Sequence, residues 1–178
     1  MGALRPSFFT VIIMNKKIRS LVYGALIAAL YVTLTYMQNF LLPGTTSYAI
    51  QFRVSEALCV LALFTPAAIP GLTIGCLLFN VSSGALPLDF VIGSAASFLA
   101  AGGMYLTRKL TFRGYPFLAM LMPALCNGLL VGWELDYIMG GGFWLNAMYV
   151  AIGEAAVLLT LGTFLFYGLK KVESRLCG

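Results

Sequence analysis

Long apolar runs separated by short polar breaks dominate the hydrophobic pattern of this chain. Six such segments can be delimited, at about 18–42, 55–64, 69–83, 88–106, 117–133 and 143–169. The breaks between them carry helix-terminating residues, among them Pro43-Gly44, Thr65-Pro66 and Gly140-Gly141-Gly142. Because a bilayer-spanning helix takes about 20 apolar residues, the pattern predicts an all-α membrane protein with six transmembrane helices.

The second and third segments, 55–64 and 69–83, are short and bracketed by prolines. Helices that do not cross the full bilayer are tolerated where they are buried in protein or line a cavity. We therefore expect a single six-helix membrane domain over 14–178, with two short helices in mid-chain. The string Met14-Asn15-Lys16-Lys17 is typical of a bacterial start, so we expect residues 1–13 to be an extension without a structural role.

Composition supports a membrane protein, because 61% of the residues are hydrophobic and only 10% are charged, whereas soluble domains carry roughly 25%. Most basic residues flank the ends of the apolar segments that would face one side of the membrane: Arg5, Lys16, Lys17, Arg19, Arg108, Lys109, Arg113, Lys170, Lys171 and Arg175. By the positive-inside rule, both termini are predicted to be cytoplasmic, in the plasma membrane of a bacterium. The net charge of +5 is therefore attributed to topology and not to nucleic-acid binding.

Several chemistries lack the residues that they need. The chain contains no histidine, its four cysteines are isolated, and it has no GxxxxGK[ST], GxSxG or HExxH string. We expect no catalysis, no metal and no cofactor in this chain.

Polar residues inside apolar segments are the candidate binding residues, because an unpaired ionisable group there is costly. Glu154 lies deep in the sixth segment and shares a helix face with Asn146, and Asn127 shares one with Glu134 in the fifth. The remaining candidates are Asn80, Asp89, Glu56, Arg53, Trp133, Trp144, Tyr31 and Gln38. Purely structural roles stay open for some of them: Glu56 and Asp89 can cap helices, and Trp133 can belong to an interfacial aromatic belt.

The first segment has two different faces. Ala25 and Ala29 lie on one face and permit the close approach of another helix. Tyr31 and Gln38 share a face roughly 140° away. One side of this helix therefore suits a partner helix, or internal packing, and the other can face a pocket.

Strings between Gln51 and Ala101 resemble those of the QueT family of queuosine-precursor transporters, the substrate-binding (S) components of energy-coupling factor importers. The resemblance rests on Arg53-Val54-Ser55-Glu56-Ala57-Leu58, on Pro70-Gly71-Leu72-Thr73-Ile74-Gly75-Cys76, and on Asn80 and Asp89. It continues through Asn127-Gly128, Glu134 and Gly153-Glu154. It implies a six-helix S component that works with a transmembrane coupling protein and two cytoplasmic ATPases, with Ala25 and Ala29 meeting the coupling protein.

The resemblance also implies a 7-deazaguanine ligand, such as the 7-cyano or 7-aminomethyl compound or queuine. A guanine-like base offers an N1–H and a 2-amino group, which one carboxylate can accept together. We expect Glu154 or Glu134 to read this edge, with Asn127, Asn80 and Asn146 adding hydrogen bonds. Asp89 or Glu56 would take an amine, and Trp133, Trp144 or Tyr31 would stack on the base.

Other functions compete with this one. An S component for another vitamin, such as a thiamine-like cationic pyrimidine, would use the same acidic and aromatic residues. A stand-alone secondary transporter would need no ATPase partner, and a membrane enzyme would need a nucleophile and base that the chain does not offer.

Overall fold

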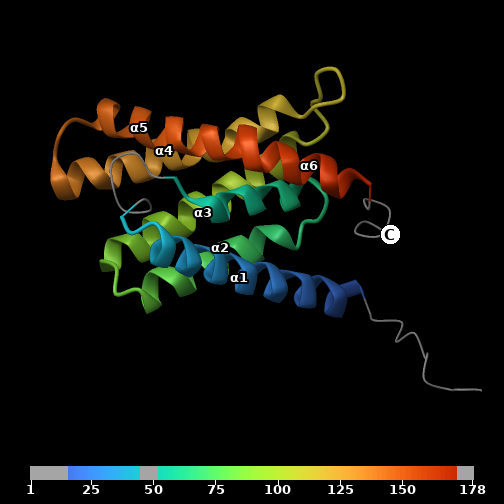
Figure 1. Cartoon of the computed structure of the whole chain (residues 1–178), viewed down its shortest axis with the longest axis horizontal. Helices are drawn as coiled ribbons and strands as arrows, with labels where there is room; N and C mark the ends of the chain where they lie inside the picture. The colour runs from blue at the N-terminus through green and yellow to red at the C-terminus, as the bar shows by residue number, and fades with distance from the viewer. Residues whose placement is uncertain (1–15, 45–51, 172–178) are drawn as a thin grey trace, which may run out of the picture.

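The computed structural model describes residues 16–44 and 52–171, so the expectation for residues 1–13 lies outside the described residues. All elements within these ranges are helical (Figure 1). In chain order they are α1 (Lys16–Leu41), the 3₁₀ helix η2 (Val54–Leu63), α2 (Ala68–Ser82), α3 (Pro87–Thr107), α4 (Phe117–Met139), α5 (Phe143–Val157), the π-helical turn η3 (Leu158–Gly162) and α6 (Thr163–Lys170).

The helices run back and forth along one bundle (Figure 1). The start of α1, the α3–α4 loop and the end of α6 lie at one end, and the α2–α3 and α4–α5 turns lie at the other. The α5, η3 and α6 elements join into one run, Phe143–Lys170. This run and α1, α3 and α4 are the four described helices that are long and apolar enough to cross a membrane, while η2 and α2 are shorter. The all-helical prediction is confirmed.

The short helix η2 lies in the core of the bundle. Most of its residues are buried, including Cys59, Val60 and Ala62, which have no exposed surface. A 3₁₀ helix rises about 2.0 Å per residue against about 1.5 Å in an α-helix. The ten residues of η2 therefore extend further along the bundle than ten residues of an α-helix would.

Close helix contacts depend on two glycines with no room for a side chain. A Cβ on Gly71 of α2 would lie 2.7 Å from the carbonyl oxygen of Gly24 on α1. A Cβ on Gly132 of α4 would lie 2.6 Å from Cα of Ala147 on α5. These contacts bring α1 to α2 and α4 to α5 at backbone distance, as small residues do in membrane helices.

The fifth segment continues further than the apolar pattern predicts. We expected it to end near Trp133, and α4 continues to Met139. Glu134 and Asp136 interrupt the apolar run, but Glu134 is buried and Asp136 closes the helix by accepting a hydrogen bond from the backbone N–H of Gly142. This extra length of α4 forms one wall of the site.

Candidate ligand cavity at the acidic end of the bundle

A cavity of about 370 Å³ opens at the end of the bundle opposite Lys16 and Lys170. Its walls come from the last turns of α1 and α2, the residue before η2, the α2–α3 turn, the first turns of α3, and α4. Ligand cavities in proteins measure about 300–1,000 Å³. The cavity is thus large enough for a small heteroaromatic molecule.

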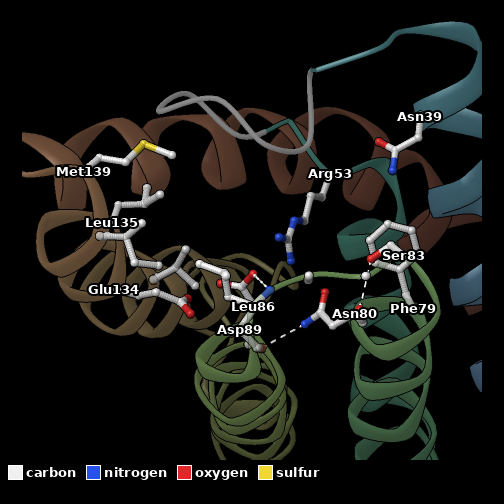
Figure 2. A pocket seen from close by; sticks show the side chains of 15 residues that line it. Asn39, Arg53, Phe79, Asn80, Ser83, Leu86, Asp89, Glu134, Leu135 and Met139 are labelled. Atoms are coloured by element: carbon white, nitrogen blue, oxygen red, sulfur yellow. Dashed lines mark hydrogen bonds between the residues drawn. The ribbon is translucent and has the colours of Figure 1, made fainter.

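Four predicted site residues line this cavity: Arg53, Asn80, Asp89 and Glu134 (Figure 2). Glu134 is 4% exposed, and its buried Oε1 atom has no hydrogen-bond partner among the described residues. The buried Nε of Arg53 also lacks a partner within the described ranges. A buried polar group without a partner costs about 1–3 kcal/mol, so one acceptor and one donor on these walls remain to be satisfied.

Local backbone structure positions the two polar groups opposite them. Asp89 lies in the first turn of α3, where Oδ2 accepts a hydrogen bond of 2.9 Å from the N–H of Leu86. Asn80 donates from Nδ2 to the carbonyl oxygen of Asp89 at 2.9 Å, which turns its own side-chain oxygen toward the cavity (Figure 2). The capping role predicted for Asp89 therefore coexists with a place in the cavity wall.

The charges of the cavity are unequal. The carboxyl groups of Asp89 and Glu134 are electrostatic neighbours, and Arg53 is the one cation among the described residues of the lining. Burial opposes the charge on the Arg53 guanidinium, but Tyr31, Cys76, Glu56 and Glu154 favour it, and the net pKa is raised above its usual value. The guanidinium is a permanent donor group.

A second buried polar cluster contains four further predicted residues. Tyr31 donates to Oε1 of Glu56 at 2.8 Å, and Asn127 donates to Glu154. Glu56 and Glu154 are each 1% exposed and interact electrostatically, and Oε2 of Glu154 has no hydrogen-bond partner in the described part of the chain. None of the four lines the cavity.

The other predicted residues also lie outside the cavity lining. Gln38 accepts from the N–H of Val54 at 2.7 Å and donates to the carbonyl oxygen of Phe52, and Asn146 donates to that of Gly140 at 3.0 Å. Trp133 is 47% exposed and stacks on Tyr137, and Trp144 is 73% exposed. The exposure of Trp133 fits the aromatic-belt alternative.

Several lining residues were not among the predicted site residues. They are Asn39, Phe79, Ser83, Leu86 and an apolar wall on α4 made of Val131, Leu135, Ile138 and Met139. Positions 131, 135 and 138 follow helical spacing, so continuing the fifth segment beyond Trp133 would have found this wall. Asn39 directly follows the predicted residue Gln38, and Phe79 directly precedes Asn80. Nothing in the sequence pattern marked either of them as a site residue.

Ala25 and Ala29 are exposed on the outer side of α1. Together with Gly24, Ala28, Gly71 and Ile74 they line an apolar groove of about 760 Å³ between α1 and α2. They therefore do not pack inside the described part of the chain.

Comparison with known proteins identifies the family of this chain. The family model described as QueT transporter matches residues 21–171, which include every residue of the cavity lining. No curated protein and no solved structure matches the chain. The match covers far more than half of the sequence, and the chain therefore belongs to the QueT transporter family.

Proposed function

We propose that this chain is the substrate-binding S component of an energy-coupling factor importer, and that its cavity captures a 7-deazaguanine precursor of queuosine for ATP-driven uptake. Membership of the QueT family supports transport of a queuosine precursor. The partners and the ligand itself are part of the proposal.

The observation that carries the proposal is the pair of unsatisfied buried groups on the cavity wall. Oε1 of Glu134 requires a donor and Nε of Arg53 requires an acceptor. A deazaguanine offers both on one edge, since its N1–H and 2-amino groups donate and its neighbouring carbonyl oxygen accepts. Glu134 would accept from the donor pair, Arg53 would donate to the carbonyl, and Asn80 and Asp89 would bind the rest of the ligand.

The positions of the two carboxylates that the sequence left open favour one of them. Glu134 lines the cavity, whereas Glu154 lies in the second cluster beside Asn127. We therefore assign the base edge to Glu134. Phe79 and the apolar wall of α4 supply the surfaces against which a flat ring would lie.

The groove on α1 supports the partner half of the proposal. Ala25 and Ala29 are exposed on it, next to the apolar surface of α2. A helix of the coupling protein could approach closely over these small side chains. The ATPases would act through that protein, because this chain has no phosphate-binding loop.

A binding titration tests the ligand assignment. Detergent-purified protein is titrated with 7-cyano-7-deazaguanine, 7-aminomethyl-7-deazaguanine, queuine, guanine and thiamine. Tight binding of a deazaguanine, with guanine and thiamine much weaker, is the expected result. Binding of thiamine alone would favour an S component for a cationic pyrimidine.

Uptake by reconstituted protein tests the mechanism. Proteoliposomes that contain this chain alone should accumulate no ligand, and uptake should require the coupling protein, both ATPases and internal ATP. Accumulation by the chain alone would identify a secondary transporter.

A further inference from the structure

A second, smaller cavity lies at the basic end of the bundle. It has a volume of about 170 Å³ and is lined by Leu63, Phe64, Arg108, Thr111, Gly114, Pro116, Phe166 and Lys170. Among the described residues, the lining contains two cations from helix ends far apart in sequence, and no carboxylate. The positive-inside rule explains why basic residues gather at this end, but it does not explain why two of them line one cavity.

Both cations are held by aromatic side chains. The guanidinium carbon of Arg108 lies 3.6 Å from the ring centroid of Tyr105, and Nη1 donates to the carbonyl oxygen of Tyr105. Nζ of Lys170 lies 5.7 Å from the ring centroid of Phe166. These contacts restrain each charge without neutralising it.

The loop between α3 and α4 is fixed against α6, which keeps the cavity formed. Phe112 and Tyr115 exchange two backbone hydrogen bonds across a turn in which Arg113 and Gly114 have φ of 51° and 79°. Tyr115 in turn hydrogen-bonds to Thr163 and packs edge-to-face on Phe166. The loop that lines the cavity is therefore held against the helix that carries Lys170.

The N-terminus of α4 adds to the positive potential. Pro116 lines the cavity and precedes α4, which has no side-chain cap and no acidic residue in its first turn. The amide groups of an uncapped first turn favour an anion.

From these features we propose that this cavity binds the phosphate headgroup of an anionic membrane lipid between Arg108 and Lys170. The cavity lies at the end of the bundle where membrane-spanning helices meet the aqueous phase, and basic pockets between such helices suit acidic headgroups. The site is separate from the acidic cavity, so the proposal does not depend on the identity of the transported ligand.

Thermal unfolding of the full chain in detergent tests this proposal. Dihexanoyl phosphatidylglycerol, the matching phosphatidylcholine and inorganic phosphate are added in turn. We expect phosphatidylglycerol to raise the melting temperature at lower concentration than the other two, and added salt to reduce the difference. If the two lipids raised the melting temperature equally, the proposal would be wrong. If phosphatidylglycerol and inorganic phosphate raised it equally, the ligand of the cavity would be a free anion and not a lipid.

Variants identify the site. Each cation near a lipid surface contributes about 1 kcal/mol, so Arg108→Gln and Lys170→Gln should each weaken phosphatidylglycerol binding about fivefold. Arg108→Lys, which keeps the charge, should retain most of the affinity. Lys109→Gln removes a neighbouring cation that does not line the cavity, and it should have a smaller effect. If Lys109→Gln lost as much affinity for phosphatidylglycerol as Arg108→Gln, the lipid would be attracted by the surface charge in general and not bound at this cavity.

Discussion

At the scale of single residues, Glu134 and Asp136 offer a matched pair on one helix. Glu134 faces the cavity, whereas Oδ1 of Asp136 accepts an exposed hydrogen bond of 2.9 Å from the N–H of Gly142. Glu134→Gln should weaken deazaguanine binding about 30-fold or more, because an amide offers one acceptor oxygen in place of two and leaves a buried donor of the base unpaired. Asp136→Asn retains an acceptor oxygen and should change the affinity by less than about threefold. Calorimetric titration of both variants measures the difference, and similar losses would exclude Glu134 as the reader of the base edge.

Glu154 is equally buried but has a different position. Because it does not line the cavity, Glu154→Gln should leave the ligand affinity within about threefold of the parent protein. The same titration applies. If the affinity fell as far as in Glu134→Gln, the base edge would belong to the deeper cluster of Glu154 and Asn127.

At the scale of elements, buried hydrogen bonds tie α1 to η2, among them that of Tyr31 to Glu56. The hydroxyl of Tyr31 donates to Glu56 at 2.8 Å, and both residues are 1% exposed. Tyr31→Phe would leave the Glu56 oxygen without this donor and should lower the unfolding free energy by about 1–3 kcal/mol. Tyr36→Phe is the control, because Tyr36 donates an exposed hydrogen bond to Ser82 at 2.8 Å. Thermal unfolding in detergent should show the larger shift for Tyr31→Phe.

The contact of α4 with α5 depends on Gly132. The added Cβ of Gly132→Ala would meet the backbone of Ala147 at 2.6 Å, so the helices must separate. Overpacking of this kind typically costs about 1–3 kcal/mol. Gly168→Ala, whose Cβ would meet nothing within 4 Å, should instead be neutral or stabilising. Unfolding measurements that gave both variants the same stability would contradict the close approach.

Element positions were largely predictable because proline and glycine mark most of the breaks. The predicted segments 55–64 and 69–83 lie within two residues of η2 and α2. The end of α4 was predicted too early, since Glu134 reads as a solvated end unless the cavity that it faces is known. The 3₁₀ form of η2 and the π-helical turn η3 were not predicted, because packing and not the apolar pattern decides between these windings.

Site membership was only partly predictable for a related reason. The free-energy cost of burying a polar group identifies the residues that need a hydrogen-bond partner. It does not say whether that partner belongs to a ligand or to the protein. Gln38 and Asn146 are satisfied by backbone groups, and Glu56 is satisfied by Tyr31. Only the folded chain separates these residues from Glu134 and Arg53, which keep unsatisfied atoms on a cavity wall.

At the scale of the whole molecule, ligand capture and partner binding occupy different surfaces. The acidic cavity opens at one end of the bundle, while the groove of Ala25 and Ala29 runs along the outside of α1 and α2. If both proposals hold, a change in the groove should abolish transport and leave ligand binding intact. This separation distinguishes an S component from a transporter that works alone.

Ala29→Leu makes that separation measurable. A leucine at this exposed position would fill the groove without entering the core, so the isolated protein should keep its deazaguanine affinity. ATP-dependent uptake by the reconstituted complex should fall more than about tenfold, because the added bulk costs more than about 1.4 kcal/mol at a close helix contact. Ala95→Leu places the same change on the exposed face of α3, outside the groove, and should leave uptake intact. Normal uptake by Ala29→Leu would remove the groove as the partner surface, whereas joint loss of binding and uptake would show that α1 supports the cavity itself.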